Sequence, residues 1–374
     1  MWNEHAKITI IGVDDSEWVI HGPGSKSSPV RLREGDLGEF YDAPFSSSYK
    51  GVVGRAGKRY TGHHFLERNI VLDLHIYADS GRTWGQVDSD FRRAFDPELE
   101  ATIVVETELS GERWLKVRLG EHPAYQGGLD PHETTGGDFQ YVLVAANPYW
   151  CSGTVTDEFV FSGSNWYGDG VRVSNPGDVP AWPKWVLTAP AKYGLPDVSW
   201  RNDGEKDRMV FLPFQPHGRE VLVDTDPHEE MITANDGTLL WAKMNGQFFQ
   251  HPIPGRTPVT ELPVYVDPFP MLPFNLPVEW RIWIAQKMRE WAEQLGLTAF
   301  LALTPEDIGN KIREWMDGTI PDWVPVLSSD VLSEMTGAFI ANLIRETYGR
   351  IGNIAGATAQ VRVDVLWSRP WGLE

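Results

Sequence analysis

Short segments that alternate apolar and polar residues, separated by turn residues, are the feature that most limits how this chain can fold. In residues 66–79, Ile70, Leu72 and Leu74 occupy every second position. Side chains at that spacing share one face of an extended strand and can pack together on one side of a sheet. The same pattern recurs along most of the chain, so we expect a mainly β protein with some α+β character.

One helical pattern lies among the strands of the first 150 residues. Trp84, Val87 and Phe91 recur at helical spacing, and Pro97 follows where a helix should end. Strands are expected around this helix at residues 7–13, 17–22, 66–79, 102–119 (as a hairpin) and 138–150. Residues 1–150 are therefore predicted to form an N-terminal β-rich domain with one packed helix.

The next part of the chain consists of short predicted strands separated by turns. These strands are expected at residues 158–163, 171–175, 184–190, 197–202, 208–213, 220–225 and 238–244, and a further strand at 357–371. Many short strands at this spacing are typical of a β-sandwich. We predict a sandwich domain made of residues 151–267 and 356–374.

Residues 268–355 interrupt the sandwich with a proline-rich arm and a helical insertion. The proline-rich stretch begins near residue 258 and is expected to be extended but unpaired, because proline lacks the N–H that a sheet needs. Trp280, Trp291 and Trp315 lie on apolar stripes at helical spacing. Such stripes cover the β domain or bind a partner, and these tryptophans are candidate assembly residues.

A rigid corner joins two strands at Asn175-Pro176-Gly177-Asp178, and Pro183 follows just before the next strand. Pro176 fixes its φ angle, Gly177 permits a positive φ, and the Asn and Asp side chains can bond their own backbone. The corner offers neither a nucleophile nor a cradle for phosphate. It therefore indicates a scaffold, and these five residues are candidates for positioning one domain against another.

The charge balance and the cysteine content exclude several classes of protein. The 33 Lys and Arg residues stand against 52 Asp and Glu, giving a formal charge of −19 that disfavours binding to nucleic acid. Cys151 is the single cysteine, so no disulfide can form within the chain. We find neither an apolar run long enough to span a membrane nor a signal peptide, and we expect synthesis in a cytoplasm.

The sequence lacks the motifs that carry common catalytic chemistry. There is no P-loop, no G-x-S-x-G elbow and no EF-hand loop. His132-Glu133 and His228-Glu229 each lack a second histidine four residues later, so neither pair predicts a zinc site on a helix. We therefore expect no enzymatic activity, no catalytic residue, no metal and no cofactor.

A glycine-rich basic segment spans residues 50–60, with Arg55, Lys58 and Arg59 among its glycines. The glycine spacing is that of a dinucleotide loop, but such a loop opens a helix, and here both flanks are extended. A flexible basic loop is the favoured interpretation. In an acidic protein, such a loop is a candidate docking element for an acidic neighbour.

Three segments together resemble a known family. They are the strand end at 147–150, the corner at 174–183 and the closing segment at 363–371. This arrangement is similar to the distal tail proteins of siphophages, many of which are called minor tail proteins in phages of actinobacteria. The resemblance covers residues 1–266 and 357–374, and the insertion departs from the family's simple pattern.

The resemblance implies a structural role in the tip of a virion tail. Family members form a homohexameric ring through their N-terminal domains, and their C-terminal galectin-like sandwich faces outward. The implied partners are the tail tube protein, the tape-measure protein, the tail-associated hub and other minor tail proteins. The family is not enzymatic, and the insertion is expected to contact a neighbouring tail protein or subunit.

Two other functions fit parts of the sequence. A carbohydrate-binding module that recognises a host glycan predicts exposed aromatic residues on a concave sandwich face, whereas Trp182, Trp185 and Trp200 are more simply interpreted as core residues. A polysaccharide hydrolase is less favoured. It predicts two carboxylates in one cleft, with the pKa of one of them raised.

Overall fold

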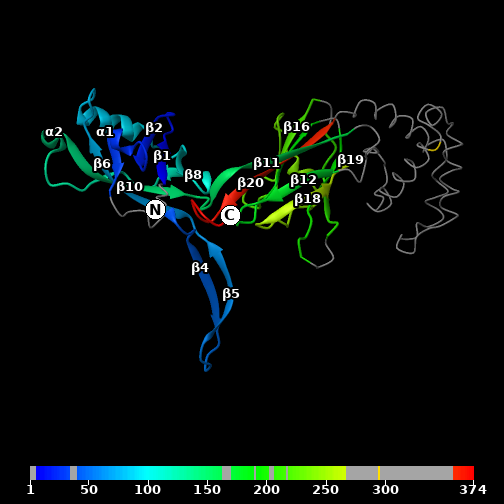
Figure 1. The fold of residues 1–374 in the computed structure, drawn as a ribbon. Coiled ribbons are helices and arrows are strands. Elements are labelled where there is room, and N and C mark those ends of the chain that lie inside the picture. The colour runs from blue at the N-terminus through cyan, green and yellow to red at the C-terminus, as the bar shows by residue number, and fades with distance from the viewer. Residues whose placement is uncertain are drawn as a thin grey trace.

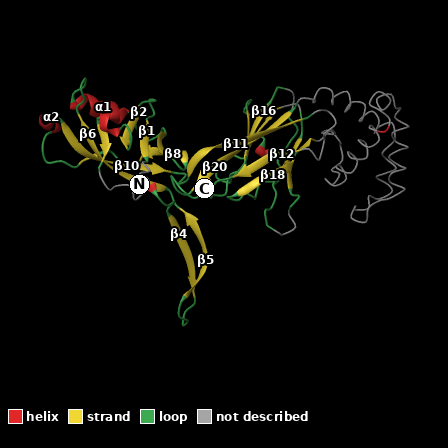
Figure 2. Ribbon diagram, viewed as in Figure 1, coloured by secondary structure: helices red, strands yellow, loops and turns green. Residues whose placement is uncertain are grey.

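The computed structural model describes residues 6–33, 40–161, 170–188, 191–201, 206–215, 218–266 and 357–374, together with Gln294. The described part is mainly β, as predicted (Figure 2). Figure 1 shows two β-rich bodies at the two ends of a pair of long strands, β11 (Trp150–Val160) and β20 (Thr358–Trp367). A hairpin projects from the region between the two bodies.

The N-terminal body consists of antiparallel strands around one helix, α1 (Trp84–Arg93). Its strands are β1 (Lys7–Ile11), β2 (Glu17–His21), β3 (Val30–Leu32), β6 (Arg68–Tyr77), β7 (Ala101–Thr107), β8 (Gly111–Leu119), β9 (Ala124–Tyr125) and β10 (Gly136–Ala145). A short helix, α2 (Pro131–Thr134), and a 3-10 turn, η1 (Ser25–Ser27), complete it. Ile70, Leu72 and Leu74 of β6 are fully buried, as their alternation predicted.

The helix α1 forms where the apolar spacing predicted it. Its first turn is closed by a hydrogen bond from the Thr83 N–H to the Gln86 side-chain oxygen, at 2.9 Å. Val87 and Phe91 are completely buried against the strands, and Phe91 meets Trp18 edge to face at 5.2 Å between ring centroids. The amphipathic face of the helix therefore supplies one side of the N-terminal core.

The C-terminal body contains three groups of antiparallel strands. They are β17–β16–β13–β20–β11, β12–β18 and β15–β14–β19. Their bounds are β12 (Gly170–Asn175), β13 (Lys184–Thr188), β14 (Tyr193–Pro196), β15 (Met209–Phe211), β16 (Glu220–Asp224), β17 (Ile232–Ala234), β18 (Thr257–Pro263) and β19 (Tyr265–Val266). Trp185 lies at the centre of this core and is fully buried.

Two of the predicted strands are wrong. The strand expected at 197–202 is replaced by β14 just before it, and the buried Asp197 carboxylate accepts hydrogen bonds from the backbone N–H groups of Gln250 and His251. The strand expected at 238–244 contains a 3-10 helix, η3 (Trp241–Lys243). Leu240 and Met244 are both buried although they are four positions apart, which is a helical spacing.

The proline-rich stretch that begins near residue 258 also differs from its prediction. Its first part belongs to β18, which pairs with β12 from Gly170↔Pro263 to Asn175↔Thr257. Only Pro258 and Pro263, near the two ends of the strand, interrupt the row of N–H donors, so the middle of the ladder can form. Apart from Gln294, the expected arm and insertion at 268–355 lie outside the described residues.

The pair β11–β20 belongs to both bodies. The two strands run antiparallel from Trp150↔Trp367 to Val160↔Thr358. Within β20, Val361 packs in the C-terminal core, whereas Val365 and Trp367 pack in the N-terminal core. One ladder, with an irregularity between Cys151 and Thr154, therefore connects two apolar cores. The domain boundaries drawn from the sequence remain predictions.

Candidate assembly interface

The projecting hairpin consists of β4 (Phe45–Gly51) and β5 (Lys58–Phe65), and we call it the β4–β5 hairpin. Among the described strands, β4 and β5 pair only with each other. Figure 1 shows them extending away from both bodies. The outer edge of each strand therefore presents backbone N–H and C=O groups that a further strand could pair with. The flexible loop expected at 50–60 is instead the end of a paired hairpin.

An aromatic row runs along one face of the hairpin. Register places Phe45 opposite Phe65, and an irregularity next to Ser48 brings Tyr49 opposite Tyr60, with ring centroids 5.7 Å apart. His63 lies between these pairs, and its Nδ1 atom is 2.6 Å from the Tyr60 hydroxyl. The exposed fractions of Phe45, Tyr49 and Tyr60 are 62%, 57% and 51%, so the row lies open to a partner.

The tip of the hairpin is a tight turn with an apolar apex. The Arg55 N–H donates to the Val52 carbonyl at 3.2 Å, and Gly54 has a φ of 82°, the value of the third residue of a type II turn. This turn leaves Val53 fully exposed at 102%. The turn needs a positive φ at this position, which glycine adopts without strain. Gly54 is therefore explained by the geometry of the hairpin turn and not by a dinucleotide-binding loop.

The β4–β5 hairpin carries a charge opposite to that of the rest of the chain. Residues 45–65 contain Lys50, Arg55, Lys58 and Arg59 and no acidic residue. This segment contributes +4 to a chain of formal charge −19, so the other residues sum to −23. The three basic residues singled out from the sequence thus lie on the projecting hairpin.

The corner at 175–178 is rigid, although for partly different reasons than its sequence suggested. Asn175 is completely buried and donates to the carbonyls of Val179 (2.8 Å) and Ile253 (3.1 Å). Its side-chain oxygen also accepts from the Gly177 N–H, as expected of a turn asparagine. The exposed Pro176 lies between these bonded residues.

Gly177 does not have the positive φ that the sequence suggested. Glycine is needed here because the backbone of the corner lies very close to β20. A Cβ atom at position 177 would lie 2.1 Å from the Leu366 carbonyl oxygen. Only a residue without a side chain allows the two backbones to approach this far. The corner is therefore pressed against the end of β20.

Asp178 and Pro183 fasten the corner to other strands. The Asp178 carboxylate accepts from the Ser368 N–H at 2.8 Å and from the Ser368 hydroxyl at 2.5 Å, and not from its own backbone. The buried Pro183 carbonyl accepts from the Thr225 hydroxyl at 2.7 Å. Both contacts connect the entry to β13 with distant parts of the chain.

A pocket of about 580 Å³ lies between the hairpin and the bodies, and we call it the hairpin-base pocket. The hairpin supplies Phe45, Ser47, Tyr60, His63 and Phe65, and the bodies supply Asp42, Ala43, Tyr149, Asp178, Val179, Pro180 and Ser368. The structure thus brings the predicted corner next to the hairpin.

The aromatic row continues through this pocket into the body. Phe65 contacts Tyr149 edge to face at 5.4 Å between ring centroids. Burial raises the pKa of the Tyr149 phenol from 10 to about 12, with a further contribution from the Asp178 charge, so this ring ionises even less readily than an exposed tyrosine. An uncharged aromatic wall suits an apolar guest.

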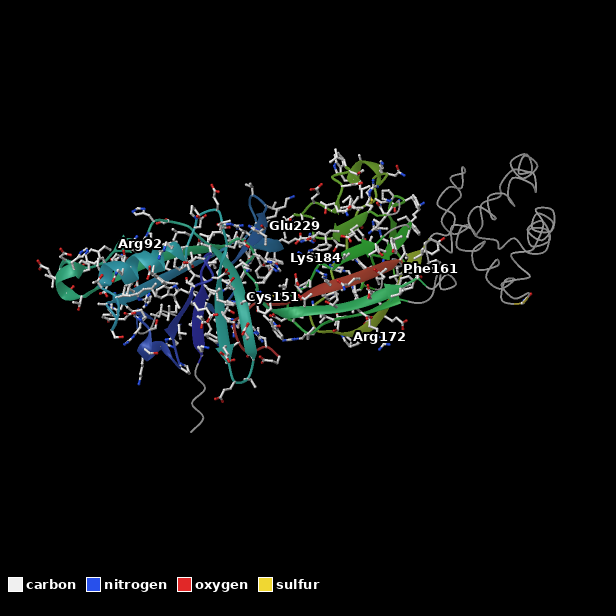
Figure 3. The ribbon with its side chains drawn as sticks, turned by 90° about the horizontal axis from the view of Figure 1, so that it is seen from above. Arg92, Cys151, Phe161, Arg172, Lys184 and Glu229 are labelled. Carbon is white, nitrogen blue, oxygen red and sulfur yellow. The ribbon has the colours of Figure 1, made fainter. Side chains whose placement is uncertain are left out.

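The cysteine and the histidines considered as catalytic or metal-binding residues show no sign of such a role where they lie. Cys151 lies at the start of β11 between the two bodies (Figure 3), and burial raises the pKa of its thiol, which makes it a poorer nucleophile. His132 and His228 each contact the aspartate two residues earlier, at 3.0 and 2.9 Å. Within the described ranges, no three His, Cys, Asp or Glu residues gather as ligands for a metal.

The three tryptophans considered for the sugar-binding alternative are buried or half-buried. Trp185 is completely buried, and Trp200 is half-buried against the C-terminal core. Trp182 is also half-buried.

A search of the described helices finds no segment that could span a membrane. Trp280, Trp291 and Trp315 lie outside the described residues, so their assembly role stays a prediction.

Sequence reasoning missed the aromatic row and the pocket. The signal was present, because Phe45, Ser47 and Tyr49 alternate, and residues 45–65 lack any acidic residue. A run of aromatic and basic residues on both sides of a glycine turn predicts an exposed hairpin. The contributions of Asp42 and Tyr149 depend on the tertiary fold.

Comparison with known proteins gives sequence relatives in phage tails. The chain is 27% identical over 304 residues to the minor tail protein Gp27 of Mycobacterium phage D29, covering 66% of this chain and 89% of the relative. It is also 27% identical over 274 residues to the minor tail protein Gp27 of Mycobacterium phage L5, covering 60% and 82%. No protein-family model matches the sequence.

Solved structures with a related chain path include the Dit (gp 19.1) protein of phage SPP1, with 14% identity, a TM-score of 0.45, and coverage of 69% of this chain and 97% of that one. A chain of the phage P2 baseplate in its activated conformation has 12% identity, a TM-score of 0.41, and coverage of 71% and 98%. The assignment rests on the sequence relatives. This chain is a relative of phage minor tail proteins, which confirms the resemblance drawn from its sequence.

Proposed function

We propose that this protein is a structural component of a phage tail tip. In this proposal, copies of the chain form a ring that joins the tail tube to the tip and supports attachment to the host. The observation that carries the proposal is the β4–β5 hairpin. Its outer edges pair with none of the other described strands, its aromatic row is exposed, and it contributes +4 to a chain of −19. The minor tail proteins among its relatives support the same role.

The physical properties of the hairpin call for a covering partner. Exposed edges and exposed aromatic rows favour aggregation unless another surface meets them. Because the other residues sum to −23, a second copy presents the acidic surface that the basic hairpin attracts. A contact between different surfaces on identical chains is head-to-tail, and such contacts close into rings when the rotation per subunit allows it. The number six comes from the resemblance to distal tail proteins.

The remaining roles follow from the same resemblance. We assign the ring to the N-terminal body and the outward position to the C-terminal sandwich. The partners proposed are the tail tube protein, the tape-measure protein, the tail-associated hub and other minor tail proteins. The chain would be made in the host cytoplasm, carried in the virion tail, and free of enzymatic activity. Residues Trp280, Trp291 and Trp315 are proposed to help the insertion contact a neighbour.

The location in the virion can be tested directly. Virions of the phage that encodes this chain would be incubated with an antibody raised against the purified protein and imaged by negative stain. We expect the label at the end of the tail distal to the head. Label confined to the head, or no label on virions that contain the chain by mass spectrometry after disruption, would contradict a tip-exposed position.

A further inference from the structure

We propose that the hairpin tip of one copy inserts into the hairpin-base pocket of the next copy. This contact rests on the proposed function, because it names the surface through which the ring would close. The two surfaces lie on the same chain, so every copy offers one tip and one pocket. Repetition of a single contact then builds the whole assembly.

The tip has the form of an apolar plug. Val52 and Val53 are exposed by 64% and 102%, which is unusual for two adjacent valines in a soluble protein. The hydrogen bond from Arg55 to Val52 holds the turn closed, so little entropy is lost when a partner binds it. Arg55 and Lys58 flank the valines with positive charge.

The hairpin-base pocket has the complementary form and charge. Its volume of about 580 Å³ lies in the range of ligand-binding clefts, and the pocket is open to solvent on one side. Phe45, Tyr60 and Phe65 give it aromatic walls. Among the described residues that line it are Asp42 and Asp178, and none of these lining residues is a lysine or an arginine.

The carboxylates of the pocket have internal partners and can still accept more. Asp42 accepts from the Arg369 guanidinium at 2.6 Å, and Asp178 accepts from Ser368. An ionised carboxylate has about four acceptor positions, so each retains capacity for a cation from outside. The valines of the tip would therefore pack against the aromatic walls of the pocket. The basic residues of the tip would lie near the carboxylates at its rim, so the two surfaces match in polarity and are opposite in charge.

The tip cannot reach the pocket of its own chain. Val53 lies six residues beyond Ser47, and a strand rises roughly 3.4 Å per residue. The two residues are thus separated by about 20 Å along a paired hairpin. The guest in the pocket must come from another copy, which makes the contact intermolecular.

A pair of engineered cysteines tests this contact. A chain that carries both Val53→Cys and Ser47→Cys would be oxidised under mild conditions and separated without reductant. A disulfide needs Cα atoms about 4.4–6.8 Å apart, so a tip seated in another copy's pocket should form one far more readily than chance encounters do. We expect a ladder of covalent multimers, reversed by reductant, with each single variant giving mainly monomer.

A matched pair controls for random collisions. It combines Val53→Cys with Leu129→Cys, because Leu129 is 71% exposed and does not line the pocket. Equal multimer yields from the two pairs would overturn the tip-in-pocket contact. Substituting the apex by Val53→Asp should weaken association at least tenfold, whereas Val53→Ile should not, and both changes lie on a fully exposed side chain that the fold does not need.

The outcomes separate this inference from the proposed function. Native mass could show rings while the Val53→Cys, Ser47→Cys pair gives no multimers. In that case the tip-in-pocket contact is wrong, and the subunits of the ring contact each other through another surface. If the chain stays monomeric at high concentration and gives no multimers, both the contact and self-assembly are wrong. Rings together with specific multimers support both.

Discussion

Asp178 accepts two hydrogen bonds from Ser368, one from its backbone N–H at 2.8 Å and one from its hydroxyl at 2.5 Å. The two residues are far apart in the sequence, and both line the hairpin-base pocket. Asp178 belongs to the corner that leads from β12 to β13, and Ser368 follows the last residue of β20. This contact therefore joins the entry of the C-terminal sheet to the segment that returns to the N-terminal body.

Replacing Asp178 by alanine should destabilise this junction. The change removes the acceptor for two charge-assisted hydrogen bonds, and we expect the free energy of unfolding to fall by about 2 kcal/mol. Denaturant unfolding monitored by tryptophan fluorescence measures it. Asp207→Ala, at an exposed aspartate, is the control and should change stability by less than about 0.5 kcal/mol. Equal effects would show that the contact contributes nothing.

Gly177→Ala should be far more disruptive than its small size suggests. The added Cβ would lie 2.1 Å from the Leu366 carbonyl oxygen, so the backbone must move. We expect a loss of roughly 3 kcal/mol or more, measured by thermal unfolding. Gly128→Ala is the matched control, because nothing lies within 4 Å of the position that its Cβ atom would occupy, and it should leave the midpoint nearly unchanged. A wild-type midpoint for Gly177→Ala would contradict this close packing.

The buried Arg113 depends on the C-terminal segment. Its guanidinium donates to the carbonyls of Arg369 and Gly372, both at 2.9 Å, and to the Glu374 carboxylate at 3.0 Å. Its side chain is completely buried and lies 3.8 Å from the Trp367 ring centroid. Removing residues 369–374 should cost about 3 kcal/mol, since the buried charge then loses all three partners.

A second substitution distinguishes a lost charge partner from lost packing. In the truncated chain, Arg113→Met should restore part of the stability, because an apolar side chain needs no partner. In the full chain the same substitution should have a smaller effect than the truncation. A double-mutant cycle measures how far the two changes add. If the losses in free energy of unfolding from the truncation and from Arg113→Met are additive, Arg113 does not depend on the C-terminal segment.

Much of the fold was predictable because it depends on local periodicity. The alternation in β6, the helical spacing of α1 and the turn residues gave correct elements where one face of each element is buried. The strand predicted at 238–244 was wrong because its apolar run fits strand and helix alike, and packing of Leu240 and Met244 decided between them. Whether a segment forms a helix or a strand was thus predictable only where the spacing of its apolar residues matches the face that the fold buries.

The candidate interface was predictable only in part. Arg55, Lys58 and Arg59 were identified from sequence because charge is visible there, and the corner because turn residues are distinctive. The pocket depends on Asp178 reaching Ser368 and on Phe65 meeting Tyr149, contacts between distant segments that no local pattern encodes. The reason for Gly177 was likewise tertiary, since the close neighbour is β20.

Acid should weaken the turn that follows β17, where Asp236 pairs with Arg219, the residue that precedes β16. Hydrogen bonds from Thr238, and then from Arg219, lower the pKa of the Asp236 carboxyl from 3.8 to about 2. A lowered pKa stabilises the folded state above pH 3.8, and that contribution disappears as the pH falls toward 2. The stability difference between wild type and Asp236→Asn should therefore be present at pH 5 and decline as the pH falls from 3.8 through about 2. A difference that is constant with pH in denaturant titrations would contradict this origin.

The central claim is that the β4–β5 hairpin drives assembly of a ring. The most direct test is the native mass of the purified chain, with negative-stain images of the same sample, beside a variant in which residues 45–65 are replaced by a short turn. We predict a sixfold ring with peripheral lobes for the wild type, and a folded monomer with the same unfolding behaviour for the variant. The same number of subunits for the two chains, whether both are monomers or both are rings, would contradict the claim.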